Sequence, residues 1–527
     1  MARAGTLRRR TLLRGAALGA GSVVLLARHG RAAADKPQYG GTLRVANMST
    51  PGALDPILGR AGTEAYFWRQ FCDQLVDADP SLNPRAETSL AASWDVSDPR
   101  MATFNLRKNV VFHDGTAFNA EAVKFNIERL LDPATKATPR AAFGPVERVE
   151  VVDEHVVRFH LKRPWGSMLG MLADRGGAMN SPAAVKASGE DYALKPVSTG
   201  PFKMAEYVGG SRVRLVRNDK YWGRDADGNP LPYLDEIIIN IIPSETVQVS
   251  ALKAGELDIA YLPYREIENF ADNSAYTVQK FDGGSVACLL SYNWAKPPMD
   301  NVNLRLAVAY AINPETINKA VFFGRAIVAK GGMWPPGAWA FDPSVPRPTY
   351  NPAKAKELLA AGGMPNGFEM DAICWPSEAN TAFTQIIRAQ CAAVGIKLNL
   401  QNSDVSVATE KFYGGGGAPL FISSWSRYPE PDWVAALIYR SDGYYNAGKV
   451  KNPQLDALVD EGAATLDVAK RKQIYRQVDE IVLGQALMVP MIYGVYHAAA
   501  HKRVGNIDTM FGWDAKMYLH RIWLKKA

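Results

Sequence analysis

The sequence lacks the motifs that carry most enzyme chemistry. It contains no HExxH, GxSxG or GxxxxGK[ST] pattern, which are signatures of zinc proteases, serine hydrolases and P-loop proteins. Its four cysteines, Cys72, Cys288, Cys374 and Cys391, are widely spaced and include no CxxC pair, so a zinc site is not indicated. Isolated buried thiols are the simpler interpretation, although an oxidising compartment would permit a disulfide between Cys374 and Cys391. We therefore expect no catalytic residues, no bound metal and no cofactor.

Beyond its N-terminus, the chain also lacks an excess of positive charge. The 527 residues carry a formal net charge of +7, but residues 1–34 hold seven arginines and no acidic residue. Removing these seven from 60 basic residues leaves 53, which equals the 53 acidic residues of the chain. Nucleic-acid binding needs a surplus of Lys and Arg to neutralise phosphates, so a nucleic-acid partner is not expected.

Apolar runs long enough to cross a membrane are missing as well. The uncharged run Gly15–Ala27 has 13 residues, whereas a membrane span needs about 20. It follows the stretch Arg9–Arg14 (RRTLLR), which looks like a twin-arginine export motif, and Ala32–Ala34 offers a cleavage site. We predict a twin-arginine-type signal peptide over residues 1–34, cleavage before Asp35 and a periplasmic location. An uncleaved membrane anchor is the alternative.

What the sequence does contain is an alternation of strand-like and helix-like segments, which predicts an α/β fold class. A chain of this length is too long for one compact core, so two or more lobes are expected. Residues 41–46 and the apolar run Ile237–Ile242 predict strands, the second covered on both faces. Asn119, Asn351-Pro352 and Asn452-Pro453 each predict the start of a helix.

Five stretches that follow one another along the chain resemble the large extracytoplasmic solute-binding proteins of ABC importers, family 5, the peptide/opine/nickel-binding class. They are Ala91–Ser97 leading to Phe104–Thr116 with Ala120–Phe125, then Pro196–Phe202, Arg217–Gly223, Leu252–Ala260 and Asn303–Ile312. The likeness extends from about residue 40 to about residue 495. It is specific for the family but says little about the ligand.

The resemblance implies a two-lobe, type II-like periplasmic-binding-protein fold with an extra inserted subdomain and a ligand cleft between the lobes. Its domains would be lobe I from residues 35–71, 185–282 and 490–527, an inserted subdomain of lobe I over 72–184, and lobe II over 283–489. Two crossing strands would form the hinge, near 288–293 and near 489–493. Such a protein closes around its ligand and docks on an inner-membrane ABC permease, and we expect it to be a monomer.

The resemblance also places the stretch 423–433 (SSWSRYPEPDW) at the cleft. Many peptide-binding members carry an aspartate here that holds a ligand's α-ammonium, and alignment from Glu430-Pro431 puts Arg427 at that position. A guanidinium suits a carboxylate instead, through two parallel hydrogen bonds. Trp425 and Tyr428 would add flat apolar contacts beside it.

Alternatives stay open for each candidate. Arg427 could pair internally with Glu430 or Asp432, and the loop Trp334–Trp339 could serve recognition or inter-lobe packing. The remaining candidate ligand-binding residues are Arg175, for which a solvated loop is the simpler interpretation, Asn47, Ser49 and Thr50, which could form a plain turn, and Tyr292 near the hinge.

The predicted function is capture of a short peptide or peptide-like solute that carries a carboxylate, such as a glutathione-like or opine-like compound. A nickel-chelate-binding protein of the same class and an exported hydrolase are the alternatives.

Overall fold

A mixed sheet runs through the computed structural model, which describes residues 36–60, 62–414 and 416–526. The predicted signal peptide lies outside the described residues. The strands follow the order β15-β14-β16-β12-β17-β11-β1-β10-β9-β8, and β13 pairs with β17. Their bounds are β1 Thr42–Asn47, β8 Phe202–Val208, β9 Arg212–Arg217, β10 Glu236–Ile241, β11 Ile259–Tyr261, β12 Tyr276–Tyr292, β13 Ile327–Val328, β14 Phe368–Cys374, β15 Ile396–Asn402, β16 Leu420–Ser426 and β17 Met488–His501.

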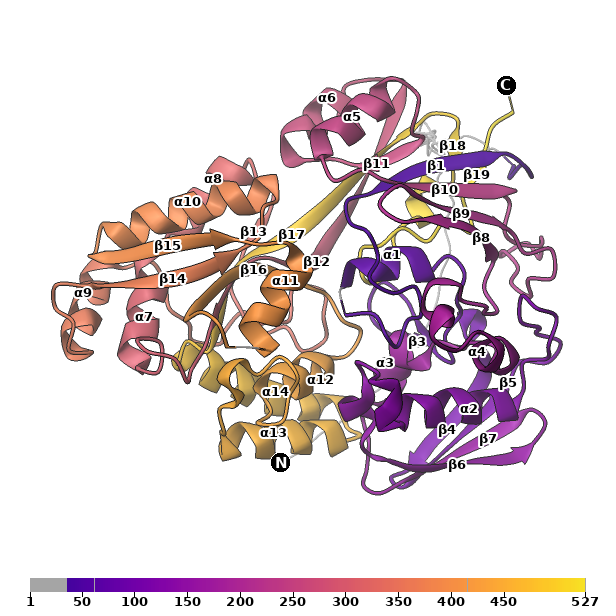
Figure 1. Ribbon diagram of the computed structural model, residues 1–527, viewed down its shortest axis with the longest axis horizontal. Helices are drawn as coiled ribbons and strands as arrows, with labels where there is room; N and C mark the ends of the chain where they lie inside the picture. Colours follow the sequence, from indigo (N-terminus) through magenta and orange to yellow (C-terminus); the bar gives the residue numbers. More distant parts are fainter. Residues whose placement is uncertain (1–35, 61, 415, 527) are drawn as a thin grey trace, which may run out of the picture. The chain divides into compact units, whose positions relative to one another are not determined.

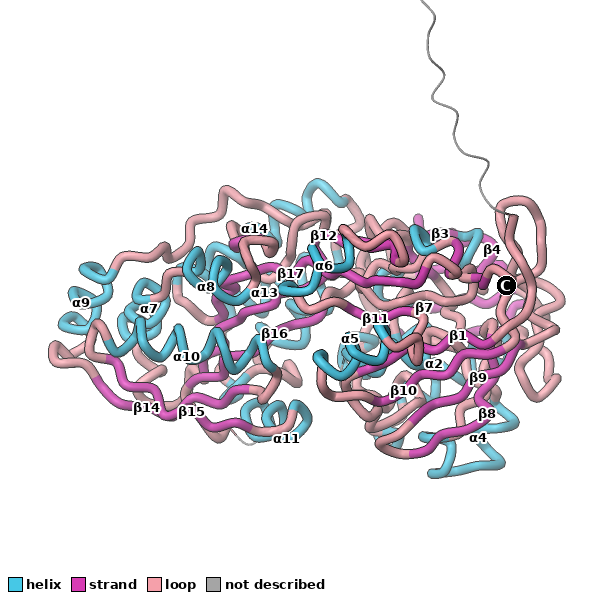
Figure 2. Tube along the Cα trace, turned by 90° about the horizontal axis from the view of Figure 1, so that it is seen from above, coloured by secondary structure: helices cyan, strands magenta, loops and turns pink. Residues whose placement is uncertain are grey.

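The two long strands β12 and β17 lie in the middle of this sheet and separate the strands of the first lobe from those of the second lobe. They pair antiparallel along their length, and Figure 1 shows them side by side between β14–β16 and β1, β10 and β11. We call β1 and β8–β11 the first-lobe strands and β14–β16 the second-lobe strands; Figure 2 shows the two groups at opposite ends of the sheet. Register shifts fall between Phe281 and Leu289, and the last of them, between Cys288 and Leu289, lies at the start of the hinge position expected near 288–293.

The apolar run that forms β10 is covered less completely than its sequence suggests. Ile237 and Ile239 are fully buried, but Ile238 and Asn240 between them are half-buried. The expectation of a strand covered on both faces is therefore wrong. The outer face of β10 borders a surface pocket that also contains charged side chains such as Arg214, so only one face packs against apolar neighbours.

A second sheet, with the strand order β4-β5-β7-β6, forms the core of the inserted subdomain. Its strands are β4 Ala91–Asp98, β5 Met101–Leu106, β6 Val146–Asp153 and β7 Val156–Leu161, and its helices are α2 Ala120–Leu131, α3 Met168–Leu172 and α4 Pro182–Ser188. The predicted cap of α2 is confirmed, because Asn119 Oδ1 accepts a hydrogen bond from Ala122 N at 3.0 Å. Two short ribbons pair β2 (Asp77–Ala78) with β3 (Pro84–Arg85) and β18 (Val504–Gly505) with β19 (Trp523–Leu524).

Helices accompany both groups of strands. The first lobe has α1 Ala65–Trp68, α5 Glu245–Lys253 and α6 Ile267–Ala271; the second has α7 Val302–Ala311, α8 Pro314–Val321, α9 Pro352–Ala361, α10 Glu378–Ala392, α11 Val405–Thr409, α12 Pro431–Val434, α13 Pro453–Ala464 and α14 Val468–Gly484. Asn351 and Asn452 cap α9 and α13 as predicted, with Pro at the first helical turn. No helix among the described residues is long and apolar enough to span a bilayer.

The four cysteines are all buried and unpaired, so the expectation of isolated thiols is confirmed. Burial raises the pKa of the thiols of Cys72 and Cys391 to about 12. These groups therefore stay protonated at neutral pH and act as small apolar side chains.

One buried carboxylate joins three separate segments of the first lobe. Asp258 is fully buried; it accepts hydrogen bonds from the backbone and guanidinium of Arg44 in β1 and from Arg503 beyond β17. We expect Asp258→Ala to lower the free energy of unfolding by about 2 kcal/mol, because it leaves charged and backbone donors unpaired. Chemical unfolding monitored by circular dichroism measures this.

The matched control for that substitution is Asp282→Ala, because Asp282 forms an exposed ion pair with Lys280. Exposed pairs contribute about 0–1 kcal/mol, so this variant should unfold close to the unsubstituted protein. Equal losses in the two variants would contradict the structural role assigned to Asp258.

Candidate functional site

Arg427 directly follows β16 and is nearly inaccessible to solvent. The end of β16 pairs with β12 through Ser426 and Ser285, which fixes where the chain leaves the sheet. The Arg427 side chain is only 5% exposed, and its Nη1 donates to the carbonyl oxygen of Trp513, in the segment after β17, at 3.2 Å. The guanidinium carbon lies 5.8 Å from the ring centroid of Phe281. First-lobe and second-lobe segments therefore meet at this side chain.

Two of the three guanidinium nitrogens of Arg427 have no hydrogen-bond partner among the described residues. Both Nε and Nη2 are buried. These two nitrogens lie on the same edge of the planar guanidinium, and this edge binds a carboxylate through two parallel hydrogen bonds. The structure thus presents a preformed donor pair inside the protein.

The carboxylates expected as internal partners of Arg427 are engaged elsewhere. Glu430 accepts hydrogen bonds from both Nη atoms of Arg471 in α14. Asp432 accepts a hydrogen bond from the hydroxyl of Ser167 at 2.9 Å. The internal pairing that the sequence left open for Arg427 is therefore not formed.

Burial without a bonded counter-charge destabilises the charged form of Arg427. Desolvation lowers the pKa of its guanidinium to about 10, and Asp514 acts in the opposite direction. The Asp514 oxygens are already used, since one accepts from Arg69 Nε at 2.8 Å and the other from Lys516 N at 3.1 Å. A buried cation without a bonded anion is costly, so an anionic ligand would be stabilised here.

Arg69 holds the Trp513-Asp514 segment in place. Its guanidinium carbon lies 4.5 Å from the ring centroids of both Trp68 and Trp513, and it also pairs with Asp174 at 3.4 Å. The Trp513 carbonyl that meets Arg427 is therefore supported by stacked rings and a buried ion pair. Sequence reasoning missed this support. The only local signal was an aromatic residue next to a charged one, as in Trp68-Arg69 and Trp513-Asp514.

Aromatic rings pack around Trp425, two residues before Arg427. The Trp425 ring centroid lies 5.1 Å from that of Tyr445 and 6.4 Å from that of Tyr428, and Tyr428 stacks on Trp433 at 5.3 Å. Trp425 Nε1 is buried with no hydrogen-bond partner among the described residues. Trp425 and Tyr428 are partly exposed and offer flat apolar surface with an unused donor. Tyr445, which the sequence did not single out, also belongs to this group.

Arg175 belongs to the same cluster. It is 3% exposed, so a solvated loop is the wrong interpretation, and its Nη1 donates to the Gly59 carbonyl. Burial raises the pKa of the Tyr428 hydroxyl to about 12, while the nearby Arg175 charge lowers it. Asp174 supplies the opposite charge, with its Oδ2 3.9 Å from Arg175 Nε. The Arg175 charge thus acts electrostatically on the Tyr428 hydroxyl.

The other expected residues make local contacts of their own. Asn47 Oδ1 accepts from the backbone N of Ser49 at 3.0 Å and from its hydroxyl at 3.3 Å, so the segment after β1 forms a turn. Thr50 is exposed on that turn. Tyr292 is buried, and its electrostatic neighbours are Cys391 and Arg305 of the second-lobe core.

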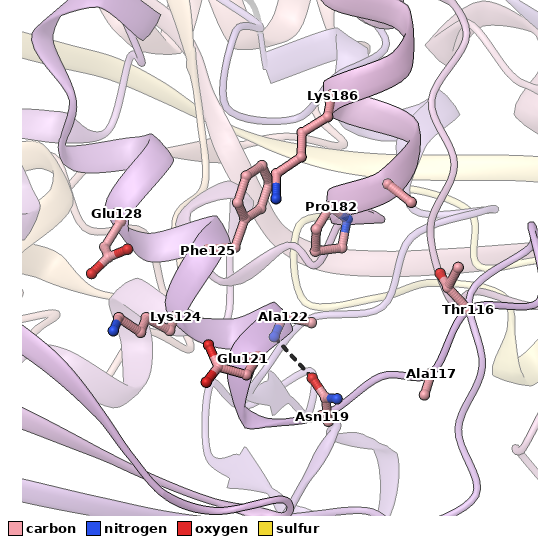
Figure 3. Close-up of a pocket in the computed structure, with 11 residues that line it drawn as sticks. Thr116, Ala117, Asn119, Glu121, Ala122, Lys124, Phe125, Glu128, Pro182 and Lys186 are labelled. Atoms are coloured by element: carbon pink, nitrogen blue, oxygen red, sulfur yellow. Dashed lines mark hydrogen bonds between the residues drawn. The ribbon is translucent and has the colours of Figure 1, made fainter.

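A separate surface pocket of about 420 Å³ lies between α2 and α4 of the inserted subdomain (Figure 3). Lys186 Nζ lies 5.2 Å from the Phe125 ring centroid, and Glu121 and Glu128 balance Lys124 and Lys186 along its lining. None of the eight expected ligand-binding residues is among the residues that line it. Within the described residues, no group of three or more His, Cys, Asp or Glu could hold a metal ion.

Comparison with known proteins identifies the family. Residues 85–446, more than half of the chain, match the family described as bacterial extracellular solute-binding proteins, family 5. The chain belongs to this family. The matched range includes Arg175 and the stretch Trp425–Tyr428.

Relatives in family 5 match along nearly their whole length. The glutathione-binding protein GsiB of Escherichia coli (strain K12) is 29% identical over 480 residues, covering 88% of this chain and 91% of the relative. The Helicobacter pylori periplasmic binding protein DppA, solved with the peptide STSA, is 25% identical with a TM-score of 0.82 and covers 93% of this chain and 99% of its own. AgaA from A. tumefaciens R10, solved with agropinic acid, is also 25% identical with a TM-score of 0.82, covering 92% and 99%. The two-lobe fold expected from the sequence is confirmed.

Arg471 is paired with a buried carboxylate, whereas Arg427 is not, and this difference can be tested by measuring stability without ligand. Replacing Arg427 by Met should leave the free energy of unfolding unchanged or raise it by about 1 kcal/mol, because an uncompensated buried charge is removed. Replacing Arg471 by Met should lower it by about 3 kcal/mol, because Glu430 is left buried and unpaired. Thermal unfolding of ligand-free protein compares the two.

Both arginines are about equally buried, so their burial does not predict a difference. A strong loss of stability in Arg427→Met would show that the Arg427 guanidinium serves the fold and would contradict its assignment to a ligand.

Proposed function

We propose that this chain is the periplasmic substrate-binding component of an ABC importer for a short peptide or peptide-like solute that carries a carboxylate. The ligand's carboxylate binds Nε and Nη2 of Arg427, and Trp425 and Tyr428 contact its apolar part. Arg175 contributes a second positive charge near the Tyr428 hydroxyl. The single observation that supports this proposal is the buried guanidinium edge without a hydrogen-bond partner among the described residues.

The ligands of the relatives agree with this chemistry. Glutathione, the peptide STSA and agropinic acid all carry at least one carboxylate. A charge-assisted hydrogen bond contributes roughly 1.5–3 kcal/mol when it is partly desolvated. The paired geometry at Arg427 also selects for a planar anion. At Arg427, this chain therefore favours a ligand carboxylate over the α-ammonium group that binds at this position in many peptide-binding members.

Ligand binding is coupled to closure of the two lobes. Two hydrogen bonds join second-lobe and first-lobe segments around the cluster. Arg427 donates to the Trp513 carbonyl, and Tyr445 Oη donates to the Arg60 carbonyl at 3.2 Å. A ligand that contacts both lobes binds the closed state more tightly than the open state and so shifts the population toward closure. The inner-membrane permease then receives the ligand intact, after export has removed residues 1–34.

Calorimetry with reduced glutathione, a tripeptide and agropinic acid tests the proposal. For any of these that binds, Arg427→Ala should weaken binding tenfold or more, since about 1.4 kcal/mol corresponds to a factor of ten. The matched control is Arg148→Ala, because the Arg148 side chain is 57% exposed on β6 and should leave affinity unchanged. Equal affinity of Arg427→Ala and the unsubstituted protein would sink the assignment of Arg427.

A further inference from the structure

The tight turn Pro335–Ala338 lies against the edge of Arg427 whose nitrogens have no hydrogen-bond partner among the described residues. Ala338 N donates to the Pro335 carbonyl at 3.1 Å, and Gly337 has a φ of +88°, as residue i+2 of a type II turn requires. A Cβ built on Gly337 would lie 3.6 Å from Nη2 of Arg427. Because glycine has no side chain, the turn comes close to the guanidinium without placing a side-chain group against Nη2.

The base of this turn is anchored to β17 and α14. Tyr493 Oη donates to the Gly332 carbonyl at 2.8 Å, and Arg347 Nη1 donates to the Gly331 carbonyl at 3.0 Å. A Cβ on Gly332 would come within 1.9 Å of Asp479 Oδ1, so the backbone here lies directly against α14. These contacts fix the position of the turn relative to the strand that crosses between the lobes.

The tryptophans on either side of the turn pack against α14. The rings of Trp334 and Trp339 lie 5.3 and 5.8 Å from that of Tyr475, and Arg471 lies 4.9 Å from the Trp339 ring. The indoles therefore pack within the second lobe, and these contacts do not amount to the inter-lobe packing that the sequence left open for this loop. The part of the loop that reaches Arg427 is the Pro-Pro-Gly-Ala turn between them.

We propose that Gly337 is a specificity-determining residue of the carboxylate subsite. Its missing side chain leaves the buried Nε and Nη2 of Arg427 without a competing group, so an anion that enters when the lobes part can bind them, and the turn Pro335–Ala338 then borders that anion. This inference rests on the proposed function of Arg427. An acidic side chain at position 337 would take the place of the ligand carboxylate and shift preference from acidic to neutral ligands.

A double-mutant cycle in ligand-free protein tests the contact. Gly337→Asp and Gly337→Asn introduce side chains of nearly equal size, and both residues tolerate positive φ better than other non-glycine residues. Gly337→Asp should unfold about 2 °C higher than Gly337→Asn, because its carboxylate pairs with Arg427. The difference should vanish when Arg427→Met is added to both. Equal melting temperatures, or a difference that survives Arg427→Met, would overturn the inference.

The matched control is the same pair of substitutions at Gly363. This residue also has a positive φ, of +81°, but a Cβ there would meet nothing within 4 Å. Gly363→Asp and Gly363→Asn should melt at equal temperatures. A difference equal to that at position 337 would show that the Asp–Asn comparison does not report on Arg427.

Calorimetry with reduced glutathione as the probe tests the effect on specificity. Gly337→Asp should bind at least about tenfold more weakly than Gly337→Asn, since a neutralised guanidinium no longer attracts the acidic probe. If the unsubstituted protein binds the probe through Arg427 but the two variants bind it equally, Gly337 has no such role and the proposed function stands. If the unsubstituted protein binds no acidic peptide, the proposed function fails, and the melting cycle alone decides whether position 337 contacts Arg427.

Discussion

The arrangement of the site depends on one buried positive charge. Arg427 keeps a single hydrogen bond, to the Trp513 carbonyl, while its Nε and Nη2 lack partners among the described residues. The carboxylates nearest in sequence bind Arg471 and Ser167 instead. A buried charge without a paired counter-charge lowers the stability of a folded protein. The unpaired guanidinium of Arg427 is therefore best explained by a function rather than by stability.

The fold places segments of both lobes around the Arg427 guanidinium. The long strands β12 and β17 belong to both lobes, and their irregular register lies close to Phe281, which covers one face of the guanidinium. Arg69, held between two tryptophan rings, fixes the opposing Trp513 carbonyl from the first lobe. The Pro-Pro-Gly-Ala turn approaches from the second lobe. These contacts from both lobes keep the guanidinium away from solvent, which strengthens its interaction with an anion.

The sequence predicted the class, the family and much of the local structure, because caps such as Asn119 and Asn452 act over a few residues. It also identified Trp425, Arg427 and Tyr428 as neighbours in one stretch. It could not predict that Trp513, more than 80 residues later, would meet Arg427, since that contact depends on the path of the chain through β17. The surroundings of Tyr292 could not be predicted for the same kind of reason. Its strand was predicted, but the direction of its side chain depends on the register shifts in β12.

Native mass spectrometry of protein purified from the periplasm tests the central claim most directly, because it detects whatever the closed lobes retain. The account predicts a bound, intact small molecule with at least one carboxylate, and its loss when Arg427→Ala protein is prepared in the same way. A retained ligand without any acidic group, or equal retention of an acidic ligand by the two proteins, would contradict the account.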